Sequence, residues 1–331
     1  MNIACPVCEA GESSFHRKID GYDYYRCDAC GSLHVDNATL AAIDHGKSTR
    51  VYDAGYWQDE LKAAHERAQG VSLVRAGEAI LYARRPVRRF LDVGTGPGYL
   101  LDALAGLLPS HAAVFHGVEL FPPAEHSRNP NYHLGDARDL DGVFDAGTCI
   151  EVVEHLTPRM LRALAQALAA ISAPGSLWLF NTGSPDYVLQ EDPDYLDPLR
   201  RGHIVAYGLR GIRRIFEPSG FHINAIPGKS YAWFAEFGPT EAPEFAERVY
   251  RPLPWNRALL EESGLLFQAA FESARASLYQ QVPVRAVGND AHVSVDVWNE
   301  YQRMLQSRSW KMTRPLRSVA GWLCKLLGRS A

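Results

Sequence analysis

Apolar runs that end in polar residues alternate with helical patterns through the middle of the chain. The segment FLDVGTGPGYLL, Phe90 to Leu101, reads as an apolar strand that ends in an acid and turns through glycines into a helix. Further apolar strands are predicted at Val114 to Leu120, just before Asp136, from Phe144 onward and up to Asn181. This alternation predicts an α/β, Rossmann-like, doubly wound fold with a mostly parallel seven-stranded sheet.

The turn after the first of these strands has the spacing G-x-G-x-G, formed by Gly94, Gly96 and Gly98. Only glycine tolerates so tight a turn and lets the backbone approach a ligand closely. The spacing is one residue tighter than the G-x-G-x-x-G of dinucleotide sites, which argues against NAD. Asp92, at the end of the strand, can accept a hydrogen bond from an ammonium group or fix the loop.

Acidic residues follow the strands at regular intervals. They are Glu119, Asp136, Glu151 and Glu154, and His155 comes directly after the last of them. Ligands of open α/β sheets bind outside the carboxyl ends of the strands, where all of these residues are expected. One such acid alone is commonly a helix cap or a solvated loop residue, but four in register indicate a binding site.

With these motifs the chain resembles the class I S-adenosylmethionine-dependent methyltransferases from Arg88 to Gly228. The resemblance implies that the three glycines pass under the methionine part of the cofactor. It also implies that Glu119 binds the ribose and that Asp136 with Ala137 meets the adenine. The segment E-V-V-E-H, which starts at Glu151, is similar to the E-x-x-E-H of ubiquinone-pathway O-methyltransferases, some of which use a divalent ion there.

Two histidines are candidates for the general base. Imidazole titrates near neutrality, and Glu154 or Glu151 can raise the basicity of His155. The alternative is that His155 caps the strand and shapes the cofactor pocket. His203 lies in a segment that resembles the acceptor-side histidine segment of small-molecule methyltransferases, and its alternative is a plain loop role.

Two C-x2-C pairs near the start of the chain predict a metal site. Cys5, Cys8, Cys27 and Cys30 have the spacing of a four-thiolate zinc ribbon, which leaves no open coordination position and is therefore structural. Disulfides are disfavoured, because no signal peptide is apparent and Cys149 and Cys324 are isolated, as in a reducing compartment. A hairpin that turns at Asp20 and Gly21 is predicted between the pairs, with aromatic residues that pack over the metal or stack on nucleic-acid bases.

The length and composition of the chain are consistent with its division into four structural regions. The chain has 331 residues, 47% of them hydrophobic, which suffices for a full core and exceeds a minimal methyltransferase domain. We expect a zinc ribbon at 1–38, a helical bridge at 39–87, the cofactor domain at 88–235 and a helical extension at 236–331. In the bridge Tyr52, Tyr56 and Trp57 resemble an active-site lid, although core packing is an equal alternative. The segment Ser184 to Arg201 is expected to be an irregular insertion.

Charge and hydropathy bear on the partners. The net charge of −4 offers no general attraction for polyanions, so nucleic acid is not an expected partner. No apolar run approaches a membrane span, which favours a cytoplasmic protein. The stretch from Arg308 to Ala331 has basic residues, no acid and an apolar helical face. It predicts a helix that lies on the inner face of an anionic membrane or docks on the protein itself.

The sequence therefore predicts a zinc-ribbon methyltransferase that acts on a hydroxyl of a small molecule or sugar. The segment SRSWKMTRPLR is similar to a C-terminal segment of bacterial surface-polysaccharide enzymes, which favours a glycan pathway. Three alternatives stay open: a nucleotide-sugar C-methyltransferase, a ribosomal RNA methyltransferase, and a zinc-ribbon interaction module with a non-catalytic cofactor fold. The oligomeric state also stays open.

Overall fold

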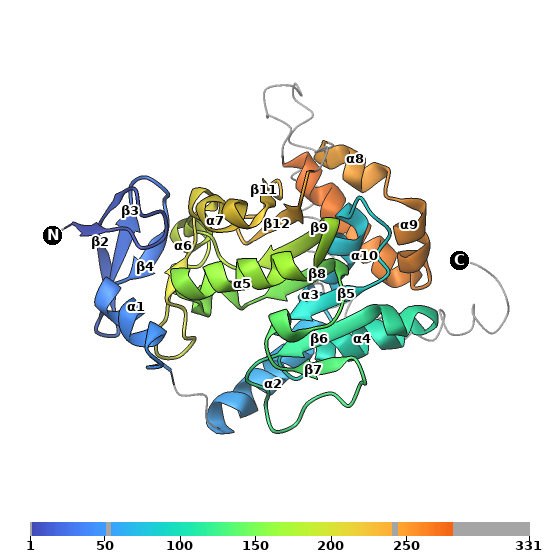
Figure 1. Cartoon of the computed structure of the whole chain (residues 1–331), viewed down its shortest axis with the longest axis horizontal. Helices are drawn as coiled ribbons and strands as arrows, with labels where there is room; N and C mark the ends of the chain where they lie inside the picture. Colours follow the sequence, from blue (N-terminus) through green and yellow to red (C-terminus); the bar gives the residue numbers. More distant parts are fainter. Residues whose placement is uncertain (1, 51–53, 240–243, 281–331) are drawn as a thin grey trace, which may run out of the picture. The chain divides into compact units, whose positions relative to one another are not determined.

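The central sheet has seven strands in the order β11-β12-β9-β8-β5-β6-β7 (Figure 1). The structure is a computed structural model and describes residues 2–50, 54–239 and 244–280. The strands are β5 (Phe90–Val93), β6 (Phe115–Glu119), β7 (Tyr132–Leu134), β8 (Phe144–Ile150), β9 (Ser172–Asn181), β11 (Phe221–Ala225) and β12 (Ala232–Phe237). Strands β5 to β9 pair in parallel, and β12 is antiparallel to both of its neighbours. The predicted mostly parallel, seven-stranded sheet is confirmed.

Helices cover both faces of this sheet, as the two hydrophobic cores show. Successive residues of β9 alternate between the cores: Leu177 and Leu179 join one, and Trp178 and Phe180 join the other. The first core also contains residues of α3 (Val71–Tyr82), α4 (Tyr99–Leu107), α9 (Pro254–Glu261) and α10 (Gly264–Tyr279). The second contains residues of α5 (Pro158–Ala170) and α7 (Leu209–Phe216). The fold is therefore doubly wound.

A second sheet has the order β1-β2-β3-β4-β10, and the four cysteines lie at the ends of its strands or in the turns beside them. Its strands are β1 (Ile3–Ala4), β2 (Glu12–Ile19), β3 (Tyr22–Cys27), β4 (Leu33–Val35) and β10 (Val205–Ala206). The predicted hairpin joins β2 to β3, and Asp20 and Gly21 have the positive φ angles, 49° and 89°, of a tight turn. The fifth strand comes from far along the chain, so the ribbon shares its sheet with the segment after His203.

The remaining helices are α1 (Asn37–Asp44), α2 (Ala54–Ala68), α6 (Pro185–Gln190) and α8 (Phe245–Tyr250). Helix α6 corrects the expectation that Ser184 to Arg201 lacks regular structure. The Ser184 hydroxyl accepts a hydrogen bond from the Tyr187 amide, and Pro185 occupies the first turn, where its missing N–H costs nothing.

Two predicted features fall outside what the structure describes. The first is the lid cluster, because the side chains of Tyr52, Tyr56 and Trp57 are not described. The second is the amphipathic tail from Arg308 to Ala331. Among the helices that the structure describes, none is both long and apolar enough to cross a membrane.

Candidate functional site

The glycine loop joins β5 to α4 in a left-handed backbone conformation. Gly94, Gly96 and Gly98 have φ angles of 69°, 56° and 80°. A Cβ on Gly94 would lie 2.5 Å from Val152 Cγ2, and one on Gly98 would lie 2.8 Å from Tyr132 Cδ2, so packing excludes side chains there. A Cβ on Gly96 would meet nothing within 4 Å. Gly96 therefore faces open space, and its backbone alone requires glycine.

Glu119, at the end of β6, lies directly against this loop. Its Oε2 accepts a hydrogen bond from the Gly96 amide at 2.8 Å, and its Oε1 accepts one from the Phe121 amide at 2.8 Å. The Tyr132 hydroxyl donates to the Gly96 carbonyl at 2.6 Å. The loop and the first candidate cofactor acid are thus brought together, at the carboxyl ends of neighbouring strands.

Asp92 and Asp136 have different surroundings. Asp92 is buried and accepts a hydrogen bond from the Thr148 hydroxyl at 2.8 Å, and burial raises its pKa to about 6. Asp92 therefore links β5 to β8 two residues before the loop begins. Asp136 caps a short 3-10 turn, because its side chain accepts a hydrogen bond from the Arg138 amide. Ala137, the other residue expected near the adenine, is buried. Neither residue contacts the glycines through a hydrogen bond that the structure gives.

The acidic segment after β8 begins with a strained residue. Glu151 has a φ of 55°, in the left-handed region that residues other than glycine rarely adopt. Its amide donates to the Asn181 carbonyl, and its Oε1 accepts from Asn181 Nδ2, both at 2.9 Å. Strain of this kind concentrates at functional sites. Asn181 was not a predicted site residue, although its position at the carboxyl end of β9 is a usable signal.

Glu154, His155 and His203 form one cluster. One ligand atom from each lies within 4.8 Å of those of the other two, and His203 Nε2 is 3.8 Å from Glu154 Oε1. Glu154 is fully buried, and neither of its carboxylate oxygens has a hydrogen-bond partner among the described residues. A buried carboxylate is costly to keep charged, so this one is either protonated or paired with a cation or a substrate group.

Burial controls the charge state of this cluster. It raises the pKa of Glu154 and of Glu151, because a buried carboxylate loses its hydration. It lowers the pKa of His155, and it lowers that of His203 to about 3, with the neighbouring His155 as a further cause. Both imidazoles are therefore neutral at pH 7.

Hydrogen bonds fix the tautomer of both rings. His155 Nδ1 lies 3.1 Å from the Gly202 carbonyl, and His203 Nδ1 lies 2.7 Å from the Tyr195 carbonyl. A carbonyl oxygen only accepts, so each Nδ1 carries the hydrogen and each Nε2 keeps a lone pair. The Tyr195 ring also packs against the His203 ring, with the ring centroids 4.5 Å apart. No pattern in the sequence marked Tyr195 as a site residue.

The four cysteine sulfurs have the spacing of a metal tetrahedron. Cys5 Sγ lies 3.8 Å from Cys30 Sγ, and Cys8 Sγ lies 3.7 Å from Cys27 Sγ. Zinc–sulfur bonds of about 2.3 Å place the sulfurs of a tetrahedron about 3.8 Å apart, whereas a disulfide needs about 2.05 Å. The arrangement fits one tetrahedral ion and excludes disulfides among these four residues.

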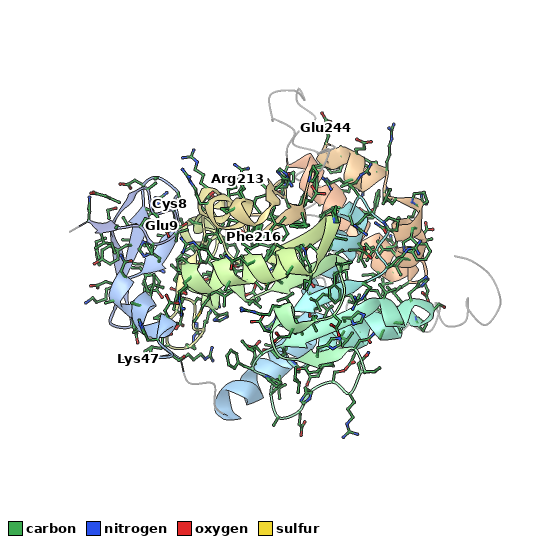
Figure 2. All side chains as sticks on the ribbon, viewed as in Figure 1. Cys8, Glu9, Lys47, Arg213, Phe216 and Glu244 are labelled. Atoms are coloured by element: carbon green, nitrogen blue, oxygen red, sulfur yellow. The ribbon has the colours of Figure 1, made fainter. Side chains whose placement is uncertain are left out.

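Cationic side chains lie beside the cysteines. A cleft of ≈ 340 Å³ is lined by Cys8, Cys30 and, from α7, by Arg210, Arg213 and Arg214; Figure 2 labels Cys8 and Arg213. A divalent ion held by four thiolates would carry two net negative charges, which these guanidinium groups would offset.

The sheet order, the glycine loop after β5 and the acids at the strand ends together define a class I methyltransferase fold. The chain belongs to the methyltransferase domain family, whose model matches residues 60–226, half of its length. The predicted family is thereby confirmed.

Curated relatives match part of the chain. A ubiquinone biosynthesis O-methyltransferase from Xanthomonas campestris pv. campestris is 34% identical over 106 residues, which cover 29% of this chain and 44% of that protein. The protein of the same name from Hahella chejuensis is 29% identical over 161 residues, which cover 45% of this chain and 63% of that protein. The chain thus spans less than two thirds of either relative.

Solved structures give more distant likenesses. The O-methyltransferase NcsB1 from neocarzinostatin biosynthesis is 15% identical, with a TM-score of 0.43 over 60% of this chain and 63% of that one. The amino pentose methyltransferase CalS10 from Micromonospora echinaspora is 21% identical, with a TM-score of 0.36 over 61% of this chain and 96% of that one. Neither the substrate nor the site residues of this chain follow from them.

Proposed function

We propose that this chain transfers the methyl group of S-adenosylmethionine to a hydroxyl group of a small molecule or sugar, in bacterial glycan or natural-product biosynthesis. The observation that carries the proposal is the cluster of Glu154, His155 and His203, which begins two residues after Val152. The Val152 side chain packs under Gly94, so the cluster follows directly on the segment that supports the loop. The family supports methyl transfer, and the partial match to O-methyltransferases supports a hydroxyl acceptor.

The proposed cofactor site is the glycine loop with the acids around it. The open space over Gly96 would take the methionine part, and Glu119 would bind the ribose. Each Glu119 oxygen already accepts one amide hydrogen and keeps a lone pair for a ribose hydroxyl. Asp136 with Ala137 would meet the adenine, while Asp92 and Glu151 would complete the pocket wall.

The proposed chemistry uses a neutral imidazole. When bound, S-adenosylmethionine supplies a methyl group that is already strongly electrophilic, so the chain mainly has to align a hydroxyl and accept its proton. His155 is only partly buried, and its Nε2 lone pair is free to take that proton. Glu154 would stabilise the resulting imidazolium. His203, whose Nε2 lies 3.8 Å from Glu154 Oε1, is the second candidate for the proton acceptor.

The same three side chains fit a divalent ion. One carboxylate and two imidazole nitrogens are a common ligand set, and the unpaired oxygens of Glu154 are what such an ion would satisfy. An ion there would lower the pKa of a bound hydroxyl. The sequence placed this ion near Glu151, Glu154 and His155; the geometry favours His203 in place of Glu151, whose carboxylate is held by Asn181.

The four cysteines would hold a structural zinc ion, because four thiolates fill its coordination sphere. Attachment of the tail to the inner face of a membrane stays a prediction about residues outside those described.

Transfer of a labelled methyl group tests the proposal. The full chain would be incubated with methyl-labelled S-adenosylmethionine and separate pools of phenols, sugar nucleotides, glycan oligomers and RNA. We expect the label on an oxygen of a small molecule or sugar. Label on a sugar carbon would establish the C-methyltransferase alternative, and label on RNA the ribosomal one. Cofactor binding without transfer to any pool would favour a non-catalytic module.

A further inference from the structure

One short segment connects the zinc ribbon to the histidine cluster. The Ile204 amide donates to the Glu154 carbonyl at 2.9 Å, and the Ile204 carbonyl accepts from the Val35 amide, in ribbon strand β4, at 3.0 Å. The next residue, Val205, pairs with His34 in the same strand. Ile204 therefore connects ribbon strand β4 to the backbone of Glu154 by one hydrogen bond on each side.

The ribbon also holds the backbone of His203. The Tyr24 hydroxyl, from β3, donates a hydrogen bond to the His203 carbonyl at 2.7 Å. Tyr24 is completely buried and His203 is 6% exposed, so water cannot replace this bond if it is lost. The ring of His203 is fixed separately by Tyr195, which leaves its Nε2 directed toward Glu154.

The connection reaches the cysteines themselves. The Ser32 hydroxyl lies 3.2 Å from Cys30 Sγ and accepts a hydrogen bond from the Gly208 amide at 2.9 Å. A Cβ on Gly208 would lie 2.2 Å from the Cys30 carbonyl oxygen, so no side chain fits between this segment and the turn that contains Cys30. The backbone from His203 to Gly208 is thus attached to the ribbon at both ends.

We propose that Tyr24 is a positioning residue, through which the metal-bound ribbon holds the His203 imidazole at its place beside Glu154. A ribbon that served only to bind a partner would need nothing beyond a linker, whereas this one shares a sheet and a hydrophobic core with the methyltransferase domain. Small displacements of a proton-accepting group cost large factors in rate. The effect on turnover rests on the proposed function, but the effect on the geometry of His203 does not.

The substitution Tyr24→Phe removes only the hydroxyl, and Tyr25→Phe in the same strand is the matched control. Tyr25 stacks on His34, and its hydroxyl has no hydrogen bond among the described residues. Four quantities would be measured on the full chain: zinc content, cofactor affinity, the ring NMR signal of His203 assigned with His203→Gln, and hydrogen exchange at the Ile204 amide.

We expect Tyr24→Phe to keep its zinc and its cofactor affinity, to shift the His203 ring signal, and to speed exchange at Ile204 about tenfold, the loss of one buried hydrogen bond. Turnover, where an acceptor is known, should fall by a similar factor. Tyr25→Phe should match the wild type throughout. Should Tyr24→Phe fold poorly, chelation of zinc from the wild type should produce the same two changes.

An unchanged His203 signal together with unchanged Ile204 exchange, in Tyr24→Phe or after chelation, would overturn the proposal. If the wild type transfers no methyl group but both geometric readouts change, the proposed function fails and the positioning role stands.

Discussion

The imidazole rings of His155 and His203 meet edge to face, with their centroids 4.9 Å apart and their planes at 77°. Each ring donates its Nδ1 hydrogen to a backbone carbonyl, and burial lowers the pKa of both. Two neutral rings thus lie close to Glu154, and His203 directs its Nε2 lone pair toward it. This pair is the feature of the site from which the catalytic predictions follow.

Replacing His155 should remove the proton acceptor. We expect His155→Ala to lower turnover by about two to four orders of magnitude and to leave cofactor affinity largely intact, as loss of a general base does. Single-turnover kinetics with a calorimetric titration would check both. The exposed His222, on β11, gives a matched control in His222→Ala. Activity that survives His155→Ala and vanishes in His203→Ala would move the base to the later loop.

The ribbon should carry one metal ion. We expect about one zinc per chain by elemental analysis, and Cys27→Ser should lose the zinc and lower the melting temperature, because metal binding in such modules is also folding energy. Since β10 pairs with β4, the loss should also increase hydrogen exchange at residues 203–208. Cys149→Ala, in β8 and outside the cluster, should retain its zinc. Protein prepared without chelator and free of zinc would show that the cysteine pairs are misinterpreted.

A histidine pair away from the site should make stability depend on pH. His116 Nδ1 lies 3.1 Å from His133 Nε2, and burial, with Arg89 nearby, lowers the pKa of His116 to about 4. An unfolded chain binds a proton at His116 near pH 6.5, whereas the folded chain does so only near pH 4. The folding stability that depends on a neutral His116 is therefore fully present above pH 6.5 and is lost progressively as the pH falls toward 4.

Urea unfolding of the wild type and His116→Gln between pH 7 and pH 5 would measure this effect. We expect a smaller slope of unfolding free energy against pH in the variant, by at most about 1 kcal/mol per pH unit, since solvent screens a half-buried ring. Equal slopes in the two proteins would assign the pH dependence to other groups.

The sheet and the glycine loop were predictable because their determinants are local. Gly94, Gly96 and Gly98 lie within five consecutive residues, and the strands carry their own apolar pattern. The helix at Pro185–Gln190 had a local signal too, since Ser184 and Pro185 form a capped helix start, but the acidic, proline-containing stretch obscured it.

The joining of ribbon and site could not be predicted in the same way. Tyr24 and His203 are separated by 179 positions, and β10 has only two residues, too few for a pattern. Such pairings depend on tertiary packing, which periodicity does not encode. The same reason explains why Tyr195, whose carbonyl lies beside His203 Nδ1, was not predicted.

Calorimetric titration with S-adenosylmethionine tests the central claim most directly. Gly96→Ala puts a methyl group into the open space proposed for the cofactor. Gly175→Ala is the matched control, because Gly175 has a φ of 81°, similar to the 56° of Gly96, and a Cβ there also meets nothing within 4 Å. Gly175 lies toward the opposite end of β9 from Asn181. The account predicts micromolar binding by the wild type and Gly175→Ala, at least about tenfold weaker binding by Gly96→Ala, and no tight binding of NAD. Equal affinities in Gly96→Ala and the wild type, or tight binding of NAD, would contradict it.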